Sequence, residues 1–139
     1  MRRAVLIVGL AMLPMIAHAE RAKPRSGTGH VAEIKTVAEG CEALFVDGRE
    51  VWREDGPVQV TSAPRWSKSG HGVAFLVRAD GTTRLIVVLI SGATAGNTLT
   101  WSVPPRALPA RSVSWLGSDR VAVGGTELEP KLVVGWEVY

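Results

Sequence analysis

The sequence predicts an all-β fold made of short antiparallel strands, and three observations support this prediction. Glycine and proline are frequent, with 15 and 8 residues among 139, which is typical of many turns joining short elements. Apolar runs of strand length are separated by turn dipeptides such as Asp80-Gly81. No stretch after residue 20 shows helical periodicity. With 46% hydrophobic and 21% charged residues, the chain is expected to fold as one domain.

The first 19 residues are expected to be a signal peptide rather than part of the fold. Arg2-Arg3 supplies a positive start, residues 4–13 form an apolar core too short for a comfortable membrane span, and Ala17-His18-Ala19 is a small-residue cleavage site. An uncleaved membrane anchor is the alternative. We therefore expect a periplasmic or secreted protein that begins at Glu20 and does not stay inserted in the membrane.

Cleavage changes the charge of the chain. The 16 Lys and Arg lose Arg2 and Arg3 while all 13 acidic residues remain, so the net charge falls from +3 to +1 and gives no reason to expect a nucleic-acid partner. Residues 20–30 are polar and contain Pro24, and they are predicted to form a flexible leader before a single β domain at 31–139. The lone Cys41 cannot form an internal disulfide. It is either a buried small side chain, which we favour, or an intermolecular bridge.

Residues 63–103 predict the best-defined part of the domain, a set of four antiparallel strands. The predicted strands lie, in order, around 65–67, 73–77, 84–90 and 97–103. Ser69-Gly70 is a turn after the first strand, and Asp80-Gly81 is a tight hairpin between the next two. The six consecutive apolar residues from Leu85 to Ile90 indicate a strand that is covered on both faces.

The same pattern occurs three times along the chain. Trp66 and Trp115 are 49 positions apart, and aligning them places Val73-Ala-Phe over Val121-Ala-Val when one residue is allowed as a gap. An earlier copy has Val37 at the tryptophan position, an apolar strand at 43–46 and its own hairpin at Asp47-Gly48. Repeats of this length predict units that bury their faces against one another.

One of these copies resembles a known family. The run Ala63-Pro-Arg-Trp-Ser-Lys-Ser-Gly70, followed by an apolar strand and the Asp80-Gly81 hairpin, resembles the blade repeat of TolB-type β-propellers, whose pattern is Pro-x-Trp-Ser-Pro-Asp-Gly. Lys68-Ser69 replaces the family's Pro-Asp, and the last copy keeps only Trp115 and a turn. The resemblance implies four-stranded blades in a periplasmic or cell-surface binding scaffold, and it supplies no catalytic residue.

About three blades would form an incomplete ring, since propellers typically need four to eight. Residues 31–35 alternate between apolar and polar and are predicted to complete the last copy as its fourth strand. If a second chain supplies this strand, the protein is a homodimer. If the same chain supplies it, a monomeric β-sandwich or partial barrel results.

Candidate catalytic and metal-binding residues are few. Ser69, His71 and Asp80 could make a hydrolytic triad on paper, but no Gly-x-Ser-x-Gly elbow is present, and a polar turn is favoured. His30 and His71 have no further His or Cys at metal-binding spacing, so no metal is expected. Gly124-Gly125 does not precede a phosphate-binding helix, and no cofactor is expected.

The tryptophans and one proline-rich segment remain as candidate binding features. Trp66 and Trp115 are predicted to lie in the core, as are the other three, although an exposed one among Trp52, Trp101 and Trp136 could stack on a sugar. The basic segment 103–111 could present a stiff contour to another protein, although a plain connection between copies is favoured. The leading hypothesis is thus an exported, non-enzymatic module that binds or scaffolds proteins. The alternatives are a carbohydrate-binding module and a small secreted hydrolase.

Overall fold

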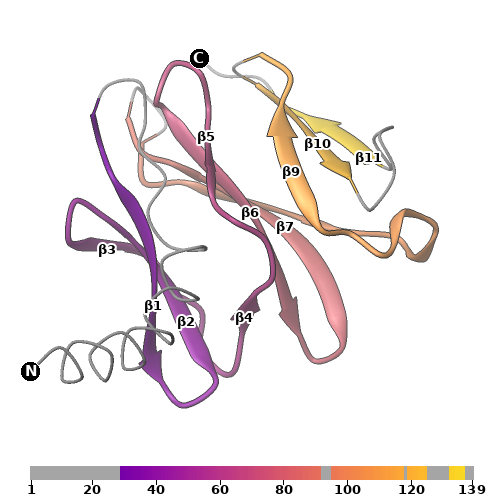
Figure 1. Cartoon of the computed structure of the whole chain (residues 1–139), viewed down its shortest axis with the longest axis horizontal. Helices are drawn as coiled ribbons and strands as arrows, with labels where there is room; N and C mark the ends of the chain where they lie inside the picture. The colour runs from indigo at the N-terminus through magenta and orange to yellow at the C-terminus, as the bar shows by residue number, and fades with distance from the viewer. Residues whose placement is uncertain (1–28, 92–94, 118, 125–131, 137–139) are drawn as a thin grey trace, which may run out of the picture.

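The computed structural model of the chain describes residues 29–91, 95–117, 119–124 and 132–136 (Figure 1). These residues fold into β-strands apart from one short 3-10 helix, and the strands make three antiparallel sheets, none of which closes on itself. The predicted all-β class is therefore confirmed. The predicted signal peptide and most of the predicted leader lie outside the described residues.

The first sheet is a meander of three consecutive strands. It consists of β1 (Ala32–Ala38), β2 (Cys41–Val46) and β3 (Arg49–Trp52). The turn between β2 and β3 is the predicted hairpin, in which Asp47 and Gly48 have φ angles of 52° and 82°. Two successive positive φ angles suit the right-handed twist of the flanking strands, and Asp-Gly adopts them at low cost.

The middle sheet contains all four strands that were predicted for residues 63–103. Its members are β4 (Gln59–Val60), β5 (Arg65–Trp66), β6 (Gly72–Ala79), β7 (Thr82–Leu89) and β8 (Thr98–Ser102). Both β4 and β5 pair with β6, with Gln59 opposite Arg78 and Trp66 opposite Val73, so together they form one interrupted edge strand. The hairpin between β6 and β7 is again an Asp-Gly turn, at Asp80-Gly81.

The last sheet follows the short 3-10 helix η1 (Pro105–Ala107). It consists of β9 (Ser112–Trp115), β10 (Arg120–Gly124) and β11 (Leu132–Gly135). Trp115 lies opposite Val121 on β10, just as Trp66 lies opposite Val73 on β6. The alignment of the two tryptophans thus corresponds to matching positions in two sheets.

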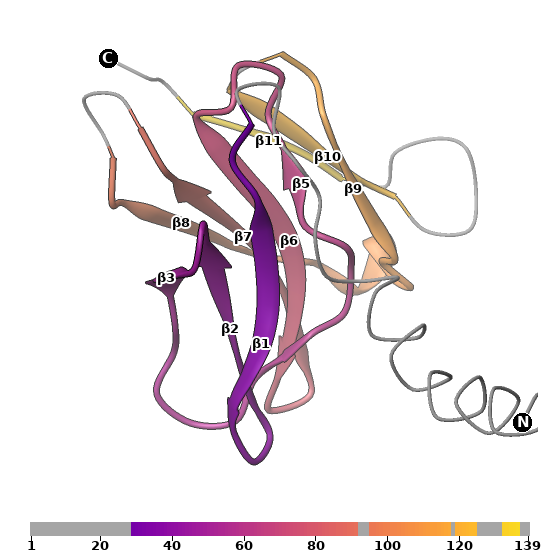
Figure 2. The ribbon, with the colours of Figure 1, turned by 60° about the vertical axis from the view of Figure 1, so that its left-hand side comes forward.

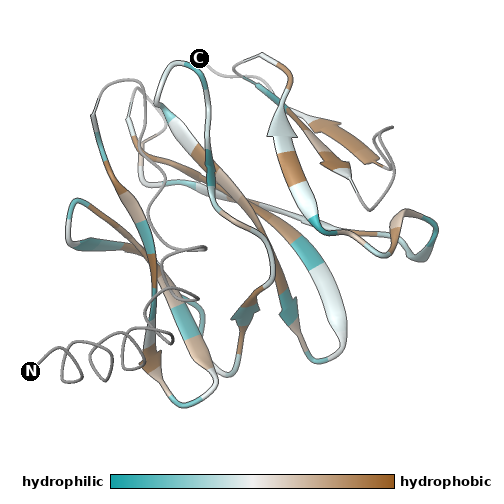
Figure 3. Cartoon of the chain, viewed as in Figure 1, coloured by the Kyte–Doolittle hydropathy of each residue, from teal (hydrophilic) through white to brown (hydrophobic). Residues whose placement is uncertain are grey.

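The middle sheet lies between the other two, and each of its faces is buried in a separate core (Figures 1 and 2). Phe75 and Ile86 pack toward the first sheet, whereas Leu76, Leu85 and Val87 pack toward the last. Successive residues of β6 and β7 alternate between the two cores, because side chains of a strand point to opposite faces in turn. The predicted burial of β7 on both faces is therefore confirmed, and apolar residues occur along strands of all three sheets (Figure 3).

The outer faces of the stack differ in character. On the first sheet, the Lys35 ammonium lies 4.7 Å from the centre of the Phe45 ring, and it also lies 4.0 Å from a carboxylate oxygen of Glu33. The outer face of the first sheet is therefore polar where it contacts solvent. On the last sheet, Ala122 pairs with Ser114 on one side and with Val133 on the other, and Val133 is 48% exposed. That outer face carries small residues together with the exposed Arg120, which lies beside Gly135.

The predicted position of the N-terminal strand is wrong. Residues 31–35 were expected to complete the last copy, but β1 pairs with β2 in the first sheet, and β11 is bonded to β10 alone within the described residues. The reason is local: the tight turn at Glu39-Gly40 folds β2 directly back onto β1, and consecutive strands commonly pair in this way. Ala32 and Ile34 then point into the core against the middle sheet.

Backbone hydrogen bonds also join the first and middle sheets at one end. The Glu42 N–H donates to the Val58 carbonyl over 3.1 Å, and the Val58 N–H donates to the Gly40 carbonyl over 2.9 Å. This single parallel bridge lies just before β4 and links β2 to the edge of the middle sheet. Such continuity between sheets is a feature of a partial barrel, whereas separate blades touch only through their faces.

Candidate functional site

The structure does not bring together the three residues of the hypothetical hydrolytic triad, Ser69, His71 and Asp80. His71 precedes β6 and Asp80 follows it, so the full length of this eight-residue strand separates them. At about 3.3 Å per residue the two side chains start roughly 25–30 Å apart. This distance rules out a direct hydrogen bond between them, and the predicted preference for a polar turn is supported.

The polar turn between β5 and β6 is organised by Ser67, which is almost fully buried. Its Oγ accepts hydrogen bonds from the backbone N–H groups of His71 and Gly72, each over 3.1 Å. Ser69 contributes only a 3.3 Å contact between its Oγ and that of Ser67. The serine that holds the turn is therefore Ser67, which directly follows β5, and its role is structural.

Replacement of Ser67 by alanine is expected to lower the free energy of unfolding by about 1–3 kcal/mol, because the buried Gly72 N–H and the partly buried His71 N–H would lose their acceptor. Ser69→Ala is the matched control and should change stability by less than about 0.5 kcal/mol. Urea denaturation of both variants checks this expectation. Equal losses for the two variants would contradict the assigned role of Ser67.

His30 forms a pair that the sequence did not suggest. Its Nδ1 lies 2.6 Å from Oδ2 of Asp47, while Oδ1 of Asp47 accepts a 2.9 Å bond from the Val31 N–H. The imidazole also stacks beside the Trp66 indole with ring centres 6.3 Å apart. These contacts hold the start of β1 against the β2–β3 hairpin. Because His30 and Asp47 are 17 positions apart, their pairing could not be predicted from the sequence.

No metal site is found in the part of the chain that the structure describes. No group of three or more His, Cys, Asp or Glu side chains is close enough there to hold a metal ion. Gly124 is the last residue of β10, and Gly125 lies outside the described ranges. Cys41 is half-buried, with its Sγ 3.2 Å from the Gly56 carbonyl oxygen, so the predicted burial of this thiol holds only in part.

All five tryptophans are at least partly buried, and none stands out as an exposed platform. Trp52 is buried and packs edge-on against Phe75, with ring centres 4.9 Å apart. Trp136 lies 5.6 Å from both Trp101 and Trp115, and this cluster packs on the core between the middle and last sheets. The Trp136 Nε1 is buried without a hydrogen-bond partner among the described residues.

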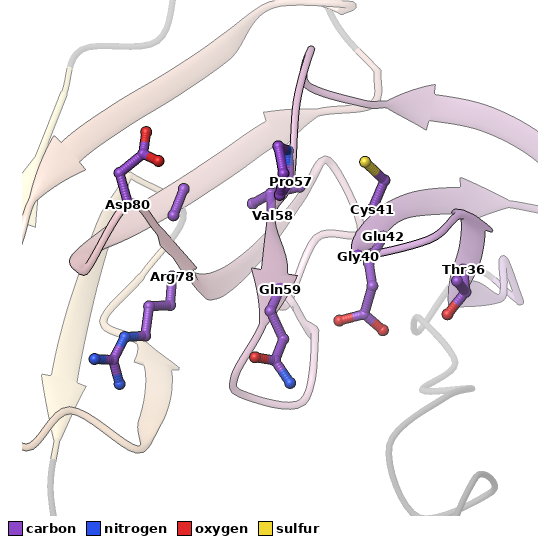
Figure 4. Close-up of a pocket in the computed structure, with 10 residues that line it drawn as sticks. Thr36, Gly40, Cys41, Glu42, Pro57, Val58, Gln59, Arg78 and Asp80 are labelled. Carbon is purple, nitrogen blue, oxygen red and sulfur yellow. The ribbon is translucent and has the colours of Figure 1, made fainter.

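Two hollows lined by described residues are considered as candidate binding sites, and they share Arg78. The first, which we call the Cys41 pocket, has a volume of about 500 Å³ and lies where β2, β4 and β6 meet. In Figure 4 the side chains of Arg78, Gln59 and Glu42 point to one side, and those of Asp80 and Cys41 point to the other. Glu42 is 9% exposed, and its Oε1 accepts a 2.8 Å bond from the Val60 N–H, so this carboxylate already serves the fold.

The second hollow, which we call the Arg111 groove, has a volume of about 520 Å³. It lies between the β6–β7 hairpin and the segment that follows η1. Its polar and apolar walls are formed by Thr61, Arg78, Thr83, Leu108, Pro109 and Arg111. The sequence had singled out 103–111 as a possible contour for a partner, but it gave no sign that Thr61, Arg78 and Thr83 would face this segment. Their position depends on strand pairing over long sequence distances.

The segment on one side of the groove is held firmly in place. The Val103 N–H donates to the Thr83 carbonyl over 3.0 Å, and the Arg111 N–H donates to the Gly124 carbonyl over 2.8 Å. Between them, Ala107 is fully buried in the core that joins the middle and last sheets. Both ends and the centre of the segment are therefore anchored, and the groove exists before any ligand binds.

Comparisons with protein families, with curated proteins and with solved structures give no match to this chain. The geometry of the chain itself is thus the basis for any assignment. No helix within the described ranges is long and apolar enough to cross a membrane.

Proposed function

We propose that this chain is an exported, non-enzymatic binding module that recognises a protein partner through the Arg111 groove. The observation that carries this proposal is the anchoring of residues 103–111, which gives the chain a ready-made concave surface. Preformed surfaces bind with less loss of conformational freedom. Leu108, 41% exposed, lies at this groove beside two arginines, and such a mixture of apolar and Arg side chains is common where proteins meet.

The three sheets are best interpreted as three copies of one propeller-like unit. The equivalent pairing of Trp66 with Val73 and of Trp115 with Val121 supports this interpretation. The two Asp-Gly hairpins, with φ angles of 52° and 53° at their aspartates, support it as well. The parallel bridge between Cys41 and Val58 favours the competing description as a partial barrel. In either description the groove lies at the hairpin end of the middle sheet.

Export of the module is proposed on the N-terminal sequence alone. The mature chain is expected to begin at Glu20, because Ala17-His18-Ala19 is a typical cleavage site after a short apolar core. Intact-mass spectrometry of protein recovered from the periplasm or the medium measures this directly. A recovered mass that still includes residues 1–19 would refute the expected processing.

A second copy of the chain is the alternative protein partner. The outer face of the last sheet, with Val133 exposed, could pack against its equivalent in a dimer. The polar outer face of the first sheet does not favour a contact at the other end. Light scattering at a protein concentration on the order of tens of micromolar distinguishes a monomer from a dimer. We expect the mass of a monomer, and a dimer mass would make self-association the better account.

Carbohydrate binding and hydrolysis have less support. A sugar platform requires an aromatic face open to solvent, and each of the five tryptophans is at least half covered or packed on a core. Hydrolysis requires the triad residues to meet, and the length of β6 keeps His71 and Asp80 apart.

Site-specific photocrosslinking in the producing cell tests the proposed function. A photoreactive residue placed at Leu108 should form an adduct with one discrete exported protein. The matched control is Leu116, which is 40% exposed on the turn after β9 and thus equally accessible. We expect the adduct at Leu108 and little or none at Leu116. Adducts of equal yield at both positions, or none at either, would contradict a partner at the groove.

A further inference from the structure

Two arginines line the Arg111 groove. Arg78 and Arg111 are both exposed, and neither makes an ion pair with any described residue. By contrast, Arg84 donates two hydrogen bonds to Glu54, over 3.0 and 2.5 Å, and Arg53 pairs with Glu50. Arg78 and Arg111 differ from the other arginines without a described ion pair in that both line the same hollow.

None of the described residues that line this groove is acidic. Asp80 is close in sequence, but in Figure 4 its carboxylate points away from the side on which the Arg78 guanidinium lies. Asp80 lines the Cys41 pocket instead. Glu54 is occupied by Arg84. Among the described residues, the groove therefore presents two guanidinium groups and no carboxylate to an anionic group that enters it.

The other residues that line the Arg111 groove limit the chemical type of ligand that it can bind. Thr61 and Thr83 add hydroxyl groups that can donate to anionic oxygens, while Leu108 and Pro109 provide an apolar wall. Guanidinium groups bind carboxylates through paired hydrogen bonds, and these bonds are stronger than those between neutral groups. A ligand that matches both walls carries carboxylates next to an apolar side chain.

We infer that the Arg111 groove binds an acidic segment of the partner protein, a short stretch of Asp or Glu residues with an adjacent leucine-like side chain that packs on Leu108. This inference rests on the proposed function and names the chemistry of the partner. The anchored segment 103–111 makes the groove rigid, so the arginines and Leu108 are already placed for such a stretch.

Calorimetric titration with short capped peptides tests the inference. The probe is an N-acetylated, C-amidated peptide of aspartates around a pair of leucines, and the control peptide replaces every aspartate with lysine. The folded mature chain should bind the acidic peptide and not the basic one.

Arg78→Gln and Arg111→Gln should each weaken binding of the acidic peptide about tenfold or more, since each removes a charge-assisted contact. Arg120→Gln, which removes an exposed arginine from β10, should leave the affinity within about twofold. Binding should also weaken as salt is raised.

Several outcomes would overturn the inference. These are an absence of binding to the acidic peptide, equal affinity in all three arginine variants, and binding to vesicles of anionic lipid without binding to the peptide. Thermal midpoints close to that of the unmodified chain confirm that the variants are folded.

Photocrosslinking at Leu108 in the Arg78→Gln/Arg111→Gln double variant separates the acidic-segment inference from the proposed function. If the adduct persists undiminished there, the acidic-segment inference fails while the proposed function stands. If no adduct forms even in the unmodified chain, the function itself fails.

Discussion

Phe75→Ala is expected to lower the free energy of unfolding by about 3–5 kcal/mol, a large fraction of the stability of a small domain. Phe75 is fully buried on β6, and its ring packs edge-on against Trp52 of the first sheet at 4.9 Å. Its removal leaves a cavity between the first and middle sheets that the surrounding strands cannot fill. Urea denaturation followed by tryptophan fluorescence measures the loss.

Phe45→Ala is the matched control for this prediction. Phe45 lies on the outer face of the first sheet beneath Lys35 and is only partly buried, so its loss should cost less than about 1.5 kcal/mol. A loss at Phe75 no greater than the loss at Phe45 would show that the first sheet does not pack on the middle sheet as described.

Trp115→Ala is expected to have the second-largest effect, about 3 kcal/mol or more. The indole fixes the last sheet to the middle sheet in two ways. It covers Gly72 so closely that a Cβ there would lie 3.0 Å from the ring, and its Nε1 donates a 2.9 Å hydrogen bond to the Arg65 carbonyl. It also packs edge-on against Trp136, which directly follows β11 of its own sheet. Loss of these contacts should release the last sheet before the rest of the domain unfolds.

Trp115→Phe separates the two kinds of contact. Phenylalanine keeps part of the packing on Gly72 but cannot donate to the Arg65 carbonyl, so we expect a smaller loss of about 1–2 kcal/mol. Hydrogen exchange should show faster opening of β9 and β10 in Trp115→Ala and near-normal protection in β6 and β7. Uniform loss of protection across all strands would contradict a separable last sheet.

Features governed by local chemistry could be predicted from the sequence. The two Asp-Gly hairpins follow from the preference of this dipeptide for two positive φ angles, and the apolar run in β7 identified a strand buried on both faces. Trp66 occupies the predicted strand position next to Val73 but is only partly buried, because its strand lies at the edge of the middle sheet. Strand identity was therefore predictable, whereas depth of burial was not.

Features that depend on distant pairing could not be predicted. The alternating pattern of β1 suits an edge strand in any of the three sheets, and only the short turn after it decides in favour of β2. The same holds for the Arg111 groove, which Arg78 on β6 and Arg111 before β9 both line although they are 33 positions apart in the sequence. A single sequence shows each arginine as one more solvated charge.

Hydrogen exchange of the mature chain, alone and with the purified partner captured at Leu108, tests the central claim most directly. The account predicts slower exchange in the partner complex at the amides of Gly81, Thr83, Leu108, Ala110 and Arg111, with the first sheet and β11 unchanged. Slower exchange confined to the outer face of the last sheet, or to the strands around the tryptophan cluster, would contradict recognition through the Arg111 groove.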